Sequence, residues 1–182
     1  MKNLITAVML VMALAGVSLA QNSAAGQANK AGRERVAVVE FIPGPKASAM
    51  IAEAKRQLQA SIAFELSQTV EFEVVDVRNT RAATQSNLIA LNAEGSTSAA
   101  VKAGKQLGAS FVLTGTVTEY DNKAGQVTMK TRLIEVATGK VKHSGETTQQ
   151  STSVLRVGGA AEMQSKVLKP AIKKLTATLT AL

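Results

Sequence analysis

The sequence contains no cysteine in its 182 residues. This absence excludes disulfide bonds, thiol nucleophiles and cysteine-ligated metal sites. It also removes the residue to which exported lipoproteins attach their lipid. Any activity of the chain must therefore come from other side chains.

Histidine and aromatic residues are also scarce. His143 is the single histidine, and it stands in a β-rich stretch beside Lys142 and Ser144, with no carboxylate at local spacing to orient it. Zinc rarely binds through carboxylates alone, so we expect no metal site. Four Phe, one Tyr and no Trp are too few for a base-stacking surface, which argues against nucleic-acid binding.

Three short patterns suggest chemistry only weakly. Gly104-Lys105 resembles the end of a phosphate loop but lacks the earlier glycine and the preceding strand. Gly158-Gly159 opens a helix and could hold an anion, although a hinge is the simpler interpretation. Glu71 and Glu73 share one face of a strand, which suits acid–base chemistry or calcium, but an exposed sheet edge explains them as well. We therefore predict no enzyme activity, no catalytic, cofactor-binding or metal-binding residues, and no cofactor.

The N-terminal residues are typical of a secretory signal peptide. Lys2 precedes an apolar run over residues 4–17, and Ser18-Leu19-Ala20 supplies small residues at a cleavage site. We predict that residues 1–20 are removed after Ala20 and that the mature protein is periplasmic; an uncleaved anchor is the alternative. Gln21 stands where a lipidated cysteine would, so the mature chain is expected to carry no lipid anchor.

The chain is basic, with 21 Lys and Arg against 13 Asp and Glu and a formal net charge of +8. Such a balance suits anionic partners such as cell-surface polymers, lipid headgroups or nucleic acid. The charges are spread along the chain without long runs, which favours the alternative of a solvated basic surface.

Residues 21–33 are polar and predict a flexible leader. Residues 34–182 predict one domain with the order strand, helix, strand, helices, three strands and a helix. The expected elements are a strand over 35–42 that ends at residues 43–45, a helix over 48–69, a strand over 71–77, a helix from Asn79 or Thr80 to Leu91, a helix over 97–107, strands over 110–120, 126–136 and 140–148, and a final helix that Pro170 kinks or splits. The fold class is therefore α/β (α+β). We expect a mixed five-stranded sheet with a parallel N-terminal part, an antiparallel C-terminal meander and flanking helices.

Three segments resemble the CsgG family of curli production assembly and transport components. Residues 36–41 are similar to its first strand, residues 107–117 to a strand that reads "lgA.yvltG.v", and residues 132–141 to a hairpin that reads "lrlvdv.TGev". Tyr120-Asp121 is similar to the ending of the second of these. The resemblance covers nearly all of residues 35–180 in the same order.

The departures from that family concern its membrane pore. The two places where the pore-former inserts spanning hairpins hold only residues 121–125 and 149–159, which is too short to cross a bilayer twice. The resemblance therefore implies a soluble member that lacks the transmembrane hairpins and the lipidation cysteine.

These observations predict a periplasmic accessory or assembly protein of the cell envelope that acts by binding proteins, for instance in a secretion or fibre-assembly system. A homo-oligomer is part of this expectation, with contacts through the sheet edges or the helix over residues 50–66. The alternative is a regulator of cell-wall synthesis that resembles penicillin-binding-protein activator lipoproteins.

Overall fold

The computed structural model describes residues 32–153, 155 and 159–182. The predicted signal peptide and residues 21–31 of the predicted leader lie outside these residues. The elements in chain order are β1 (Glu34–Val38), β2 (Ile42–Lys46), α1 (Ala52–Ser67), β3 (Phe72–Val74), α2 (Val77–Thr84), a 3₁₀ turn (Gln85–Asn87), α3 (Leu88–Asn92), α4 (Ser98–Leu107), β4 (Phe111–Asp121), β5 (Gln126–Glu135), β6 (Val141–Gln150), α5 (Ala160–Met163), a π-helical turn (Gln164–Leu168) and α6 (Lys169–Thr180).

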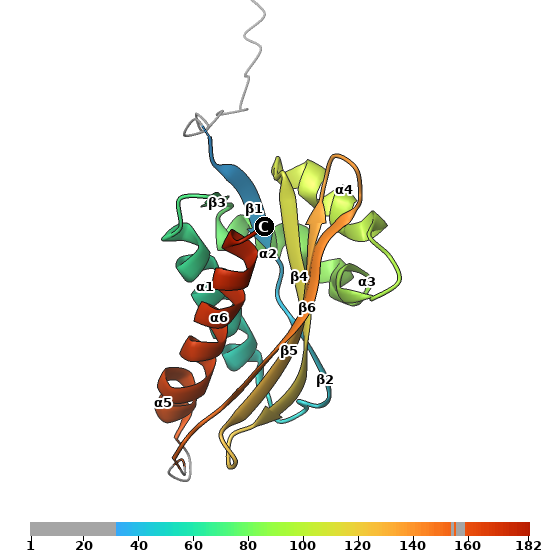
Figure 1. Cartoon of the computed structure of the whole chain (residues 1–182). Coiled ribbons are helices and arrows are strands. Elements are labelled where there is room, and N and C mark those ends of the chain that lie inside the picture. Colours follow the sequence, from blue (N-terminus) through green and yellow to red (C-terminus); the bar gives the residue numbers. More distant parts are fainter. Residues whose placement is uncertain (1–31, 154, 156–158) are drawn as a thin grey trace, which may run out of the picture.

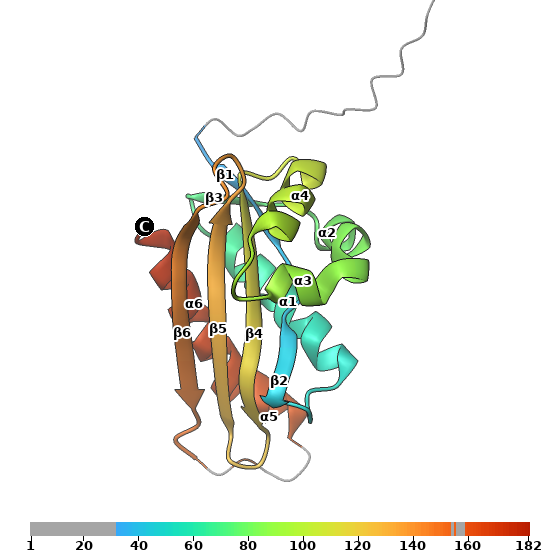
Figure 2. The same cartoon turned by 90° about the vertical axis from the view of Figure 1, so that its right-hand side faces the viewer.

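The strands form one mixed sheet between two layers of helices (Figures 1 and 2). The strand order is β3-β1-β4-β5-β6, and β2 lies beside β4. β1 pairs in parallel with β3 and β4, while β4, β5 and β6 form an antiparallel meander. The predicted fold class is thus confirmed, but the sheet has six strands and not five.

The additional strand is β2, in a segment that the sequence predicted to end a strand. Residues 43–45 read Pro-Gly-Pro, and proline cannot donate a ladder hydrogen bond. β2 pairs on one side only, in parallel with β4, and its register shifts between Pro43 and Lys46. An edge position tolerates the missing N–H groups, which is why a proline-rich strand forms here.

β1 is buried on both faces, as its uninterrupted apolar sequence predicted. Val36 and Val38 point into a core with α1 and α6, where they meet Leu58 and Ile62, among others. Alternate residues such as Ala37 point into a second, smaller core with α3 and α4. The sheet therefore separates two apolar layers, and the helices of each layer are held by burial of one face.

Helix ends differ slightly from the predicted ones. The cap of α2 is Asp76, whose carboxylate accepts hydrogen bonds from the N–H groups of Arg78 and Asn79, so the prediction of Asn79 or Thr80 as cap is wrong. An aspartate one turn earlier satisfies the same free donors. Gly108 ends α4 with φ of 61°, which confirms the predicted left-handed cap.

Pro170 lies in the first turn of α6, directly after the π-helical turn. Proline has no N–H, and its ring clashes with the carbonyl four residues earlier, so a regular helix cannot run through this point. The looser π turn absorbs the mismatch and separates α5 from α6. The predicted interruption of the final helix is confirmed.

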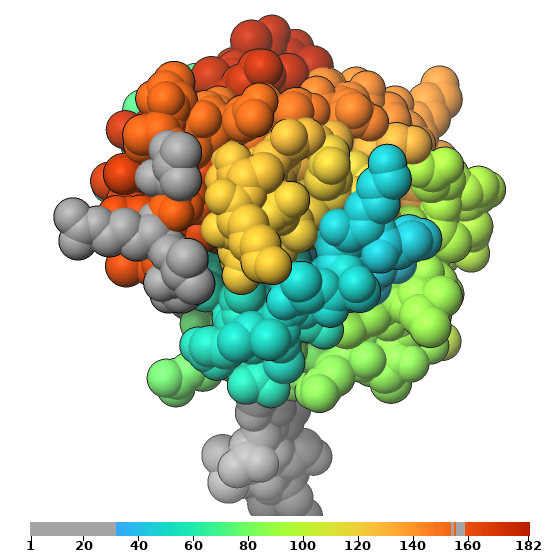
Figure 3. Space-filling view, turned by 90° about the horizontal axis from the view of Figure 1, so that it is seen from below, coloured from blue at the N-terminus to red at the C-terminus, as the bar shows by residue number. Residues whose placement is uncertain are grey.

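The two helical layers cover different lengths of the sheet. α1, α5 and α6 lie along one face, whereas α2, α3 and α4 cover only the upper part of the other face (Figure 2). Seen from below, the β4–β5 turn in yellow, β2 in cyan and the start of α1 in teal gather at the lower end (Figure 3). Part of the sheet beside α3 is therefore not covered by a helix.

Candidate functional site

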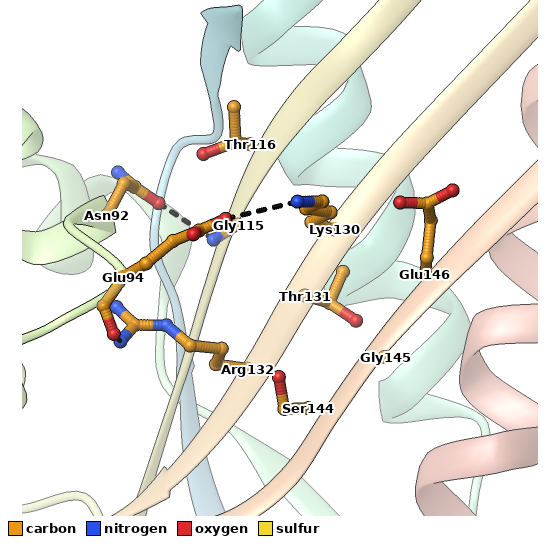
Figure 4. A pocket seen from close by; sticks show the side chains of 10 residues that line it. All are labelled: Asn92, Glu94, Gly115, Thr116, Lys130, Thr131, Arg132, Ser144, Gly145 and Glu146. Atoms are coloured by element: carbon orange, nitrogen blue, oxygen red, sulfur yellow. Dashed lines mark hydrogen bonds and ion pairs between the residues drawn. The ribbon is translucent and has the colours of Figure 1, made fainter.

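A hollow of about 400 Å³ lies on this side of the sheet, beside the end of α3 (Figure 4). Its walls are polar side chains of β4, β5, β6 and the segment after α3, and its floor includes backbone where two strands carry glycine. The lining residues are Asn92, Glu94, Gly115, Thr116, Lys130, Thr131, Arg132, Ser144, Gly145 and Glu146.

Asn92 joins the end of α3 to the sheet. Its Oδ1 accepts a hydrogen bond of 2.7 Å from the N–H of Gly115, and its Nδ2 donates to the carbonyl of Leu88 at 2.8 Å. Gly115 needs this partner because it lies opposite the gap between β1 and β2: Leu113 pairs with β1 and Thr116 with β2. A buried N–H without a partner would be costly, so Asn92 fixes one wall of the hollow.

Arg132, on β5, binds the segment that follows α3. Its guanidinium donates to the carbonyl of Glu94 at 2.8 Å and, at 3.4 Å, to those of Ser96 and Leu91. Burial lowers the pKa of Arg132, and the nearby Glu94 carboxylate partly offsets this effect. The guanidinium stays charged at neutral pH. It binds one carbonyl in the last turn of α3, that of Leu91, and two carbonyls of the segment that follows α3.

The exposed part of the hollow carries charges of both signs. Lys130 Nζ lies 3.4 Å from Glu94 Oε1, and both side chains reach into solvent. Glu146 stands directly opposite Lys130 on β6 and forms no ion pair with another described residue. An exposed pair of this kind adds little stability, so these charges are available to a partner molecule.

No histidine lies among the residues that line the hollow. Ser144 and Thr116 offer hydroxyl groups, but the histidine is elsewhere: His143 pairs with the core residue Leu133, so it points away from the face on which Ser144 lies. A nucleophile without a base in reach is not activated. The geometry suits recognition of a polar, charged surface.

The weak candidates from the sequence do not form a site together. Gly104 lies inside α4, where a Cβ would come within 2.3 Å of Val136, so it is a packing residue. Glu73 pairs with Arg35 at 3.7 Å, while Glu71 is exposed before β3. Gly159 precedes the four-residue α5, and Gly158 lies outside the described residues.

The residues of the hollow were not predicted from the sequence, in which residues 92–96 indicate a plain break between two helices. One signal was present: Lys130 and Arg132 put two cations on the same face of a strand whose other face is apolar. Among the described residues no cluster of three or more metal-ligating side chains occurs. Within the same residues no helix is both long and apolar enough to span a membrane.

Comparison with known proteins identifies one family. The family model described as "Peptidoglycan-synthase activator LpoB" matches residues 49–148, from just before α1 into β6. All ten residues that line the hollow fall inside this match. No curated protein sequence matches the chain significantly.

Two solved structures, at a TM-score of 0.50, show the same fold at low identity. Lipoprotein GNA1162 from Neisseria meningitidis is similar with a TM-score of 0.50 and 22% identity, over 81% of this chain and 96% of that one. Protein XCC0632 from Xanthomonas campestris has a TM-score of 0.50 and 12% identity, over 81% and 83%. The LpoB C-terminal domain from Salmonella enterica has a TM-score of 0.47 and 21% identity, over 66% and 84%.

The predicted membership of the CsgG family is wrong, because the family that matches is a different one. The roles in curli assembly and secretion that followed from it are wrong as well. The motif residues misled because they serve the fold. A Cβ on Gly115 would lie 2.6 Å from the ring of Phe41, and Gly139 has φ of 70°. Such residues meet the packing and turn requirements of the sheet and do not by themselves separate one family from another.

Proposed function

Because this chain belongs to the family of the peptidoglycan-synthase activator LpoB, we propose that it binds a peptidoglycan synthase in the cell envelope and raises that enzyme's activity. The observation that carries the proposal is the family match over residues 49–148. The alternative from the sequence, a regulator of cell-wall synthesis, thus replaces the assembly role.

The proposal assigns the chain a regulatory role and no chemistry of its own. A family named for activation of an enzyme agrees with the prediction that the chain is not an enzyme. The polar hollow beside α3 supports contact with a protein, since it offers Lys130, Glu94 and Glu146 to solvent without a nucleophile–base pair. We propose this hollow as part of the surface that meets the synthase.

We place the activity in the periplasm, where a signal peptide over residues 1–20 would deliver the chain. GNA1162 is described as a lipoprotein, whereas this sequence has no cysteine to carry a lipid. We therefore propose that the mature chain begins at Gln21 without an acyl group. Mass spectrometry of the protein from the native envelope tests this, and an acylated N-terminus would contradict it.

The function itself is tested with the mature chain and the peptidoglycan synthases of the same organism. We expect one synthase to be retained by the immobilised chain and to polymerise or cross-link peptidoglycan faster in its presence. The same chain after thermal unfolding is the control for nonspecific effects of a basic protein. Failure of every synthase to bind or to respond would refute the proposal.

A further inference from the structure

Helix α1 carries an exposed stripe that is separate from the hollow. We define the α1 stripe as the residues Glu53, Arg56, Gln57, Ala60, Phe64 and Ser67, all of which are exposed. At 3.6 residues per turn they fall within about 100° of the helix circumference. The opposite face of α1 is buried through Leu58, Ile62 and Leu66, so the stripe faces solvent along the side of α1 that borders α6.

Phe64 is the prominent member of the stripe, with 64% of its surface exposed. A hollow of about 340 Å³ lies between α1 and α6 beside it, lined also by Ala60 and Ile172. The ring therefore projects from the helical layer formed by α1 and α6, which lie side by side (Figure 1). An exposed aromatic ring next to small residues is typical of an interface.

Two pairs of stripe residues are spaced equally about Ala60. Arg56 and Phe64 lie four residues before and after it, and Glu53 and Ser67 lie seven residues before and after it. A two-fold axis through this point places two antiparallel copies of α1 against each other, with the small Ala60 side chains at the crossing.

In that arrangement each Phe64 meets a matching hole in the other copy. Glu53, Arg56, Gln57 and Ala60 stand at positions i, i+3, i+4 and i+7, which is the set of four residues that surrounds a knob in helix packing. Glu53 and Arg56 already form an ion pair of 3.9 Å along one side of the hole. The Arg56 guanidinium then lies over the incoming ring, a favourable cation–π contact.

We propose that the α1 stripe is a self-association surface and that its occupant is a second copy of this chain, bound through reciprocal insertion of Phe64. One helix crossing buries less than the ~1,200–2,000 Å² of a standard interface. The dimer is therefore weak and depends on protein concentration. The inference does not rest on the proposed function, because no synthase takes part in it.

The test is sedimentation equilibrium of the mature chain over a series of concentrations. We expect a monomer–dimer equilibrium that Phe64→Ala weakens about tenfold or more, since the ring is the central anchor of the interface. The matched control is Ile89→Ala, which removes a side chain that is 80% exposed on α3, in the other helical layer. The control should dimerise like the unchanged chain.

Exchanging the residues at positions 56 and 64 tests whether the specific contact, and not merely the loss of exposed apolar surface, explains the effect of Phe64→Ala. The double variant Arg56→Phe with Phe64→Arg keeps one ring and one guanidinium at each of the two contacts between position 56 of one copy and position 64 of the other. We therefore expect it to recover most of the affinity that Phe64→Ala loses. Both positions are exposed, and thermal unfolding by circular dichroism verifies that each variant folds.

Two results would overturn the inference: a monomer at all concentrations, or dimers that Phe64→Ala leaves unchanged. If the unchanged chain is monomeric and Phe64→Ala instead abolishes synthase binding, the stripe belongs to the synthase and not to a second copy. Synthase activation by the unchanged chain is scored separately, so the two proposals fail independently.

Discussion

At several positions of this protein, close packing or hydrogen bonding restricts which side chain can be accommodated. Gly115 shows this most clearly, because its missing side chain makes room for the ring of Phe41 and the carbonyl of Lys130. Arg132 is the polar counterpart, since three carbonyls depend on one guanidinium. Substitutions at these two positions should therefore lower stability.

We predict that Gly115→Ala lowers the free energy of unfolding by about 1–3 kcal/mol, the usual cost of overpacking. The added Cβ would lie 2.6 Å from the Phe41 ring and 2.7 Å from the Lys130 carbonyl oxygen, and the latter is backbone that cannot move aside easily. Urea unfolding measures the change. Gly95→Ala is the control, because nothing lies within 4 Å of its Cβ position; equal effects of the two would contradict the packing argument.

Arg132→Met is predicted to lower the free energy of unfolding by about 1–3 kcal/mol, because the carbonyls of Leu91, Glu94 and Ser96 lose their donor. The loss should be local, so hydrogen exchange should speed up in α3 and the segment that leads to α4. Lys130→Met removes only an exposed ion pair and should change stability by less than about 0.5 kcal/mol. Unchanged exchange in α3 would show that Arg132 does not anchor this segment.

At the scale of elements, turns and edges determine the shape of the sheet. The β4–β5 turn is closed by Asp121, whose carboxylate accepts hydrogen bonds from the N–H groups of Ala124 and Lys123 at 2.9 and 2.8 Å. β2 remains at an edge because of its prolines. Side-chain hydrogen bonds in turns and prolines in strands thus determine where each strand ends and which strands can pair.

The Asp121 turn gives the protein a predicted sensitivity to acid. Its hydrogen bonds with Ala124 and Lys123 lower the pKa of Asp121 below the ordinary value. A carboxyl with a lowered pKa stabilises the fold above its unfolded-state pKa, and this stabilisation is lost as the pH falls through the folded-state pKa. The pKa of Asp121, followed by NMR, should therefore lie below that of an unstructured aspartate. Asp121→Ala should flatten the acid side of the stability profile, and a profile identical to the unchanged chain would refute this.

At the scale of the whole molecule, the unequal cover of the sheet creates the candidate surface. α2 to α4 leave part of β4, β5 and β6 open, and the charged hollow lies at the border of this open part. The second helical layer, with the α1 stripe, faces the opposite direction. Synthase binding and self-association are therefore assigned to opposite sides of the sheet.

We predict that Glu146→Lys slows association with the synthase a few-fold, because charges at the border of an interface act mainly on the association rate. Surface plasmon resonance measures the rate. Glu71→Lys makes the same charge change at an exposed position before β3, away from the hollow, and should leave the rate unchanged. Equal slowing by both variants would indicate a general charge effect and exclude the hollow as the contact.

The sequence alone determined the features that depend on local patterns. The apolar run of β1, the period of α1, the cap at Gly108, the hairpins of the meander and the interruption at Pro170 all follow from side-chain spacing and backbone preference. These forces act within a few residues, so they can be read along the chain. Together they were sufficient for the fold class.

The tertiary structure alone decided what depends on contacts between distant segments. Asn92 reaches Gly115 across 23 positions, and Arg132 reaches Leu91 across 41. The edge that admits the prolines of β2 exists only once β4 is in place. The charged hollow arises where helices stop covering the sheet, which no local pattern records. The motifs that suggested the wrong family consist of residues required for close packing and turns in the sheet. Different families can share such residues, so the motifs did not identify the family.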